Sequence, residues 1–516
     1  MTQSAFQNVT IPPMDEYNQA LIANVHPPDW ANPTPADCYD LVVIGAGTAG
    51  LVSAKGAAGM GLGLKVALIE RHLMGGDCLN VGCVPSKCLI RSSRVVADMR
   101  QAAPYGIQPP ETIAVDFPKV MARMRKIRAR ISPVDSATSA QKSGVDVFLG
   151  EGKFTGPNTI QVGGKTLRFK KAVIATGARA VTPKLEGIRE AGFLTNETVF
   201  SLTEQPRRLA VIGGGPIGCE LAQSFRRLGS QVVLFERSNH VLIREDADAA
   251  EIVQQAFIEE GIQLVLGCQL QRVEMTPAGK RIIFSRNGGG EESVTVDEIL
   301  IGAGRAPNVE SLNLESAGVE YDTRHGVKVN DYLQSSNPNI YGAGDVCMKW
   351  KFTHAADAAA RIVLKNTLFS PFGFGRYRLS DLVMPWVTYT DPEIAHVGLY
   401  EHEAQQKGLS VSTIKIPFHD VDRALADGEE EGFVKIHHKK ESDEILGATI
   451  VARHAGETIS ELTTAIVGGI GLSKLASAIH PYPTQAEAIK KAADAYRRTL
   501  LTPRTKMFLK LLTKIS

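Results

Sequence analysis

The sequence predicts an α/β fold with two Rossmann-like dinucleotide-binding domains and a C-terminal α+β domain, and three observations carry this prediction. A glycine-rich fingerprint that follows a short apolar strand occurs twice, first near residue 45 and again near residue 213. Beyond about residue 380 the pattern changes to β-rich segments followed by helical ones. The 516 residues suffice for about three domains, and the hydrophobic fraction of 44% can fill a core in each.

Charge and composition exclude several classes of protein. The 57 Lys and Arg and 55 Asp and Glu nearly cancel to a net charge of +2, which argues against an electrostatic nucleic-acid binder. No stretch approaches the ~18 apolar residues of a membrane helix, and charges and prolines occupy the place of a signal peptide's apolar region. Seven thinly spread cysteines do not resemble a secreted disulfide scaffold. We therefore expect a cytoplasmic protein that binds no nucleic acid.

The first fingerprint follows a predicted strand over residues 39–44 and precedes a small-residue run that suits a helix packed on a sheet. The first glycine permits a tight turn, the second lets the backbone approach a pyrophosphate, and the third allows close packing of the helix. These glycines are Gly45, Gly47 and Gly50. A second predicted strand, 64–70, ends in Glu70, 20 residues after Gly50. At that offset a carboxylate can accept hydrogen bonds from ribose hydroxyls.

The same pattern recurs after a predicted strand over residues 209–212. Its glycines are Gly213, Gly215 and Gly218, and the strand that follows, 231–236, ends in Glu236. A lone match also marks ordinary turns, but two matches that are each led by a strand and ended by an acid rarely arise by chance. Two such sites imply two different dinucleotides.

Three further segments place glycines at the end of a predicted strand, which on its own could be an ordinary turn. They are 170–180 with Ala175, Thr176 and Gly177, 296–308 with Gly304, and 339–346 with Asp345.

The segment 75–87, GGDCLNVGCVPSK, holds Cys78 and Cys83. A regular helix would separate them by ~7.5 Å along the axis and about 140° around it, too far for a disulfide, whose Cα atoms lie within ~7 Å. The segment must therefore be irregular if the two are bonded, and Gly82 and Pro85 supply the irregularity. Cys83 then lies near a helix N-terminus, where the macrodipole lowers a thiol pKa. The alternative is two buried structural thiols.

This motif, together with the two fingerprints, resembles the flavin-dependent pyridine nucleotide-disulfide oxidoreductases over about residues 38–500. The resemblance implies that the first fingerprint binds FAD and the second NADH or NADPH. Electrons would pass from nicotinamide through flavin to a Cys78–Cys83 disulfide, with Cys83 facing the flavin and Cys78 exchanging with substrate. Lys87 and Glu220 match an ion pair beside the flavin. The residues expected at the cofactors are Gly45, Gly47, Gly50, Glu70, Ala175, Thr176, Gly177, Gly213, Gly215, Gly218, Glu236, Arg237, Gly304 and Asp345.

The residues around Glu236 bear on the choice of nucleotide. A carboxylate there favours a free 2′-hydroxyl and hence NADH. Arg237 and Arg244 favour NADPH, because a guanidinium can pair with a 2′-phosphate, and Glu236 could be neutralised by one of them. We favour NADPH.

The segment 479–488, IHPYPTQAEA, resembles the family's final motif, His-Pro-Thr-x-x-Glu, in which a partner subunit supplies a histidine and a glutamate orients it. Tyr482 occupies the histidine position here, and Glu487 is the glutamate. A phenol with a pKa of about 10 is a poor base where an imidazole at about 6.5 shuttles protons. Mercuric reductases resemble the chain in this tyrosine, yet it lacks their C-terminal cysteine pair. Alternatively, Tyr482 is an interface residue and His480 a capping or core histidine.

The resemblance implies the following organisation: an N-terminal extension on the surface (1–37), an FAD-binding domain in two parts (38–195 and 310–378), an NAD(P)H-binding domain (196–309), a dimerisation domain (379–500) and a basic amphipathic tail (501–516). We expect a homodimer with a shared active site and no structural metal site. Cys88 is expected to be buried and inert. The tail could touch an anionic membrane surface, although a helix docked on its own domain is the favoured interpretation.

The functional hypothesis is an FAD-dependent NAD(P)H oxidoreductase, similar to mercuric reductases, that acts on a small molecule, a disulfide or a thiol-reactive metal ion. One alternative is a dihydrolipoamide dehydrogenase that tolerates Tyr482. Another is a redox-sensing flavoprotein without rapid turnover.

Overall fold

The computed structural model describes residues 9–286, 288–302 and 304–515. By its contacts the chain divides into two compact units. The first comprises Met1–Gly213, Ser224–Val233 and Gln269–Leu382, and the second comprises Gly214–Gln223, Leu234–Cys268 and Val383–Ser516. Within the described ranges no helix is both long enough and apolar enough to cross a membrane.

A seven-stranded sheet forms the centre of the first unit, with the order β3-β2-β1-β6-β5-β4 and β18 paired with β6. β1 runs parallel to both β2 and β6, and its apolar residues are buried, as expected for a parallel strand covered on both faces. The predicted strand 39–44 is confirmed as β1. The strands are β1 Tyr39–Ile44, β2 Val66–Glu70, β3 Val145–Leu149, β4 Lys153–Gly156, β5 Thr159–Val162, β6 Lys165–Ile174 and β18 Ile340–Gly342.

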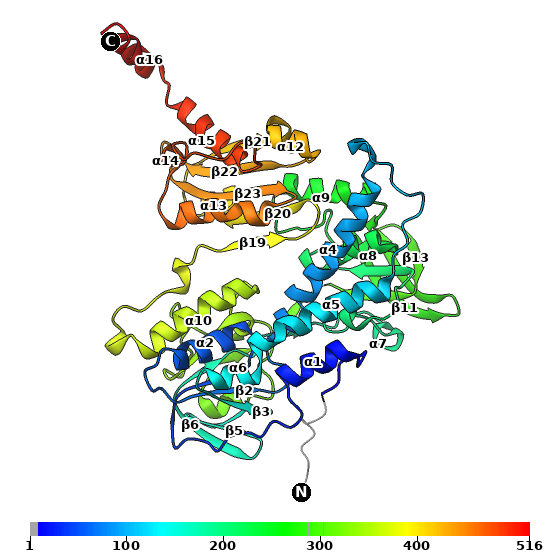
Figure 1. The fold of residues 1–516 in the computed structure, drawn as a ribbon, viewed down its shortest axis with the longest axis vertical. Helices are drawn as coiled ribbons and strands as arrows, with labels where there is room; N and C mark the ends of the chain where they lie inside the picture. The colour runs from blue at the N-terminus through cyan, green and yellow to red at the C-terminus, as the bar shows by residue number, and fades with distance from the viewer. Residues whose placement is uncertain (1–8, 287, 303, 516) are drawn as a thin grey trace. The chain divides into compact units, whose positions relative to one another are not determined.

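Helices α2 and α10 lie side by side next to this sheet (Figure 1). The loop between β2 and β3 carries four helices, among them the short α3 and the long α4. The helices of the first unit are α1 Glu16–Val25, α2 Thr48–Gly59, α3 Gly76–Asn80, α4 Cys83–Arg100, α5 Phe117–Ile131, α6 Ala137–Lys142, α7 Ile188–Ala191 and α10 Thr353–Leu368.

The N-terminal extension is more than a surface segment. Helix α1 buries Leu21, Ile22 and Val25 and contacts α5. The prediction that residues 1–37 lie on the surface is therefore wrong for α1. The apolar residues of α1 occupy one short stretch between prolines, and so short a pattern is a weak signal for a helix in the sequence.

The second fingerprint follows β8, which pairs in parallel with β14. A three-stranded antiparallel sheet, β11-β12-β13, and the pair β7 and β15 complete the first unit's larger sheets. The elements of this part of the chain are β7 Ala178–Ala180, β8 Arg208–Ile212, α8 Pro216–Leu228, β9 Gln231–Phe235, β11 Cys268–Thr276, β12 Gly279–Arg286, β13 Glu291–Val296, β14 Glu298–Ile301, β15 Arg305–Pro307, β16 Tyr321–Asp322 and β17 Gly326–Val327.

The second unit is built on an antiparallel sheet with the order β19-β20-β23-β22-β21, and α13 and α15 share its apolar core. This confirms the α+β domain that the sequence predicts. The elements are α9 Ala247–Glu259, β10 Gln263–Val265, β19 Pro385–Thr388, β20 Glu393–Gly398, α11 Glu401–Gln406, β21 Val411–Pro417, α12 Asp422–Asp427, β22 Phe433–Lys439, β23 Ile445–Ala452, α13 Ala455–Val467, α14 Leu472–Leu475, α15 Glu487–Thr499 and α16 Pro503–Leu512.

The C-terminal tail forms helix α16 after α15 (Figure 1). None of its residues is buried. The expectation that the tail docks on its own domain is therefore wrong for Pro503–Leu512.

Candidate active site

The two cysteines of the motif lie on either side of a break between two helices. Helix α3 ends at Asn80, and α4 begins at Cys83 with Gly82 as its N-cap residue. A Cβ atom at Gly82 would lie 2.7 Å from the carbonyl oxygen of Asp77, so this tight turn requires glycine. The predicted irregularity and the predicted position of Cys83 at a helix start are both confirmed.

The break brings the two thiols into contact. Cys78 is half-buried and Cys83 is exposed, and their side chains hydrogen-bond to each other. This hydrogen bond, together with burial, raises the pKa of Cys78 well above its ordinary value. Cys83 Sγ also lies 3.3 Å from the hydroxyl of Thr353, the first residue of α10, which the sequence gave no reason to expect. Cys88 is buried, as expected, and burial raises its pKa.

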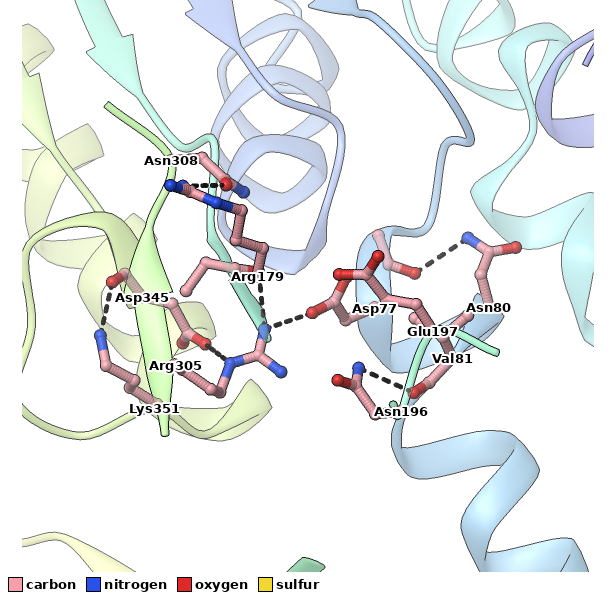
Figure 2. A network of polar contacts seen from close by, with 12 residues as sticks. Asp77, Asn80, Val81, Arg179, Asn196, Glu197, Arg305, Asn308, Asp345 and Lys351 are labelled. Carbon is pink, nitrogen blue, oxygen red and sulfur yellow. Dashed lines mark hydrogen bonds and ion pairs between the residues drawn. The ribbon is translucent and has the colours of Figure 1, made fainter. Parts of the chain in front are cut away.

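Arg305 lies between the cysteine segment and the segment of Asp345 (Figure 2). Its Nη2 pairs with Asp77, the residue before Cys78, and donates to the carbonyl oxygen of Ala178 at 2.8 Å. Its Nε lies 3.5 Å from Oδ2 of Asp345. Burial raises the pKa of Asp345, and the Arg305 charge opposes that rise. One mostly buried cation thus joins two segments that the sequence assigns to thiol chemistry and to cofactor binding.

Asn308 holds the turn that contains Ala175, Thr176 and Gly177. Its Nδ2 donates to the carbonyl oxygen of Thr176 at 2.9 Å, and the Thr176 hydroxyl donates to the carbonyl oxygen of Asn308 at 2.7 Å. Gly304 lies directly before β15, which pairs with β7 beyond the turn. The first two strand-plus-glycine segments therefore pack against each other, and their binding of a cofactor stays a prediction.

The first fingerprint forms a closed glycine turn. Gly45 has a φ of +99°, and a Cβ there would lie 2.4 Å from the carbonyl oxygen of Ala175. Gly47 is the N-cap residue of α2, and a Cβ at Gly50 would overlap the carbonyl oxygen of Gly45 at 1.7 Å. The backbone at the start of α2 thus suits the pyrophosphate of a dinucleotide.

Glu70 binds the turn of its own fingerprint. Its Oε2 accepts the N–H of Ala46 at 2.7 Å, and Oε1 accepts the N–H of His72 at 2.7 Å. Burial raises the pKa of Glu70, and these two N–H groups oppose the rise. Each carboxylate oxygen has a second lone pair, so the residue still fits the ribose hydroxyls of FAD.

The second fingerprint repeats this arrangement in the second unit. Glu236 accepts the N–H of Gly214 at 2.7 Å and that of Ser238 at 2.9 Å. A Cβ at Gly215 would meet no atom within 4 Å, which leaves room for a pyrophosphate, and Gly218 lies in α8. Because backbone N–H groups bind both oxygens of Glu236, the structure does not favour its pairing with an arginine. Arg237 and Arg244 are exposed.

Lys87 and Glu220 are placed by different units. Lys87 lies on α4, one turn after Cys83, with its Nζ 3.4 Å from the Ser86 hydroxyl. Glu220 lies on α8, is buried, and accepts the N–H of Tyr389 at 3.0 Å. Their pairing beside a flavin stays a prediction.

The C-terminal motif places Tyr482 on the surface, 69% exposed, with its hydroxyl donating to Asp422 Oδ2 at 2.9 Å. Asp422 raises the pKa of Tyr482. Glu487 begins α15, and its Oε2 is buried without a hydrogen-bond partner among the described residues. His480 Nε2 lies 2.7 Å from Oε1 of Glu461 on α13, and 7% of its side chain is exposed.

Comparison with known proteins identifies the family. The family described as pyridine nucleotide-disulphide oxidoreductase matches residues 39–360, and its dimerisation domain matches residues 384–493. The chain is 36% identical to a mercuric reductase of Lysinibacillus sphaericus, over 90% of this chain and 84% of the relative. It is also 36% identical to a dihydrolipoyl dehydrogenase of Thermus scotoductus, over 89% and 98% of the two chains.

Solved structures of similar proteins have the same fold. The HOCl-induced flavoprotein disulfide reductase RclA from Escherichia coli superposes with a TM-score of 0.77 at 26% identity, covering 88% of this chain and 99% of the other. LpdA from Mycobacterium tuberculosis gives a TM-score of 0.79 at 27% identity, covering 90% and 100%. The chain therefore belongs to the pyridine nucleotide-disulphide oxidoreductase family, whose members use FAD and NAD(P)H, and it carries that family's dimerisation domain.

Proposed function

We propose that the chain is an NAD(P)H-dependent reductase whose Cys78–Cys83 couple delivers an electron pair to a thiol-reactive metal ion or to a disulfide, similar to a mercuric reductase. The observation that carries the proposal is the contact between the two thiols at the start of α4. FAD, when bound, supplies the two-electron connection between nicotinamide and sulfur. Glu70, Asp345 and the Thr176 turn would hold it.

With a disulfide substrate the chemistry of the thiols is an exchange in two steps. Cys78 first passes its proton to the Cys83 sulfur, to which it is hydrogen-bonded. As thiolate it then attacks one substrate sulfur, forms a mixed disulfide and releases the first substrate thiolate, which takes up that proton from Cys83. Cys83 then attacks the Cys78 sulfur, restores the Cys78–Cys83 disulfide and releases the second thiolate. Each cycle oxidises one NAD(P)H to NAD(P)⁺, consumes one proton and yields two substrate thiols. The Thr353 hydroxyl, 3.3 Å from Cys83 Sγ, is placed to hydrogen-bond this sulfur throughout.

Tyr482 favours a mercuric reductase-like activity over dihydrolipoamide oxidation. The relatives of the two kinds are equally similar in sequence, so identity alone does not separate them. A phenol whose pKa Asp422 raises further is a weak base for a dithiol, yet once its hydroxyl turns away from Asp422 it can donate a hydrogen bond to a metal-bound thiolate. In the homodimer that we propose, Tyr482 and Glu487 of one subunit face the cysteines of the other. The exposure of Tyr482 and the buried, unpartnered Glu487 oxygen support this arrangement.

The test is a steady-state screen of acceptors with NADH and with NADPH, using Hg(II), Cu(II), an aromatic disulfide and lipoamide. We expect NADPH-dependent reduction of a metal ion or of the aromatic disulfide, and its loss in C83S with FAD retained. Unchanged activity in C83S would remove the proposal. Rapid NAD-linked oxidation of dihydrolipoamide would instead support the second candidate, a dihydrolipoyl dehydrogenase, which the Thermus scotoductus relative favours.

We further propose that the enzyme works in the cytoplasm, the compartment that keeps thiols reduced, and that α16 contacts an anionic membrane surface there. Exposed Phe508, Leu511 and Leu512 have the spacing of one face of α16. Lys506 and Lys510 share another face. Such a helix binds anionic lipid through both faces.

Sedimentation with vesicles tests the contact of α16 with lipid. The dimer should bind vesicles containing phosphatidylglycerol and not pure phosphatidylcholine, and a variant with L511E and L512E should lose binding. Equal retention by both vesicles, or by the variant, would contradict the proposal.

A further inference from the structure

The N-terminal segment 9–37 precedes the family match, which begins at residue 39. It contacts residues 72–74, which lead into α3 and the two cysteines. The carbonyl oxygen of Val25, the last residue of α1, accepts the N–H of Met74 at 3.1 Å. The next residue, His26, hydrogen-bonds through Nδ1 to the carbonyl oxygen of His72. Both acceptor and donor sites lie within six residues of Cys78. The segment thus follows the chain that leads into α3.

Arg128 of α5 connects this segment to α3. Its Nη2 donates to Asn18 Oδ1 of α1 at 2.6 Å, and its Nη1 donates to the carbonyl oxygen of Asn80 at 2.5 Å. Asn80 lies between the two cysteines, and its Nδ2 donates to the carbonyl oxygens of Met74 at 3.0 Å and Gly76 at 2.9 Å. The Arg128 guanidinium therefore joins α1 to Asn80, the residue whose side chain hydrogen-bonds the backbone before Cys78.

The burial of Arg128 is costly. The residue is 2% exposed, and its Nε has no hydrogen-bond partner among the described residues. Burial lowers the pKa of the guanidinium to about 10, so it remains charged at neutral pH. An apolar side chain of similar size would often serve stability as well or better. The geometry of its two hydrogen bonds is therefore the stronger reason for an arginine at this position.

Arg125, one turn before Arg128 on α5, also binds α1. Its Nε pairs with Asp15 Oδ2 at 2.5 Å, at the N-cap of α1, and the side chain is 8% exposed. Arg125 thus fastens α1 to α5 as Arg128 does. Arg128 in addition donates a hydrogen bond to the last residue of α3, Asn80.

We propose that the N-terminal segment 9–37 is a positioning element of the thiol pair, with Arg128, held by Asn18, fixing Asn80 and so the approach of Cys78 to Cys83. This inference rests on the proposed redox role of the two cysteines. A loop held in this way keeps one thiol at a high effective concentration beside the other. Loss of the connection lowers that concentration and makes the disulfide easier to reduce.

The experiment compares the wild-type holoenzyme with R128M and R125M. Each protein is equilibrated in glutathione redox buffers, alkylated, and analysed for Cys78 and Cys83 by peptide mass spectrometry. We expect the equilibrium constant for disulfide formation to fall roughly tenfold in R128M, a rise of about 30 mV in potential, and to change less than twofold in R125M. The KM for NADPH should not change. FAD content and the thermal midpoint verify folding.

The results distinguish a failure of the proposed redox function from a failure of the positioning role. A wild-type protein that forms no Cys78–Cys83 disulfide removes the proposed function. A disulfide whose equilibrium constant is the same in R128M and R125M overturns the positioning role alone. If R128M does not fold, N18A replaces it, with an expected threefold fall, and a wild-type equilibrium constant in N18A overturns the inference.

Discussion

Arg305 pairs with Asp77, the residue directly before Cys78, while the same guanidinium lies 3.5 Å from a carboxylate oxygen of Asp345. The three charges come from α3, β15 and the segment after β18. A single buried cation thus serves two carboxylates, one beside the thiol pair and one expected at the flavin. Removal of this cation affects both segments at once.

R305M should destabilise the protein by about 3 kcal/mol, because the mostly buried Asp345 loses its larger stabilising charge and keeps only the attraction of Lys351. Denaturant unfolding and the FAD content measure this loss. The control is R361M, whose exposed pair with Asp357 on α10 should contribute little.

The loss in R305M should shrink at acid pH. Burial already raises the pKa of Asp345 in the folded protein, and removal of Arg305 raises it further. The folded variant then binds a proton that the unfolded chain does not, so its stability rises as pH falls from 8 towards 5. An equal loss at both pH values would contradict this explanation.

Cys78 should react slowly with iodoacetamide in the reduced holoenzyme. Its pKa lies above that of a free thiol, about 8.5, because of the hydrogen bond with Cys83 and because of burial. The alkylation rate at pH 8 should be at least tenfold below that of free cysteine and should still climb above pH 9. In C83S the rate at pH 8 should increase. A rate that levels off below pH 8 would count against the thiol contact.

The sequence predicted those features that neighbouring residues determine. The strand 39–44, the helix start at Cys83 and the glycine turns each follow from local pattern and backbone chemistry. The docking of α1 and the bonds of Arg128 and Arg305 were not predicted, because they join positions far apart in the chain. Pairs such as Arg305 with Asp77 depend on tertiary packing, which no spacing rule encodes.

Y482H should enable the enzyme to oxidise a dithiol such as dihydrolipoamide. An imidazole titrates near neutral pH, whereas Asp422 raises the pKa of the phenol that it would replace. We expect kcat for dihydrolipoamide oxidation to rise by roughly a hundredfold, with a new dependence on pH between 6 and 7. Y482F serves as the control and should show no such gain. A dihydrolipoamide activity that is already high in the wild type would refute the argument.

Replacement of Arg237 and Arg244 by alanine tests the nucleotide choice. Both are exposed, and Arg237 directly follows Glu236, whose oxygens accept backbone N–H groups. Loss of charge-assisted hydrogen bonds to a 2′-phosphate should raise the KM for NADPH by roughly tenfold or more. The KM for NADH, measured with the same protein, should stay within twofold of wild type. A parallel rise for both nucleotides would show that the arginines do not select between them.

Glu70 and Glu236 each hold the backbone of their own glycine turn. Both turns are therefore held by hydrogen bonds within the polypeptide. An enzyme of this kind exchanges its nicotinamide partner at every turnover, and a turn held in this way spares it the ordering of a loop each time. For the same reason, the glycine turn can keep its conformation when the oxidised nucleotide leaves and the next reduced nucleotide binds.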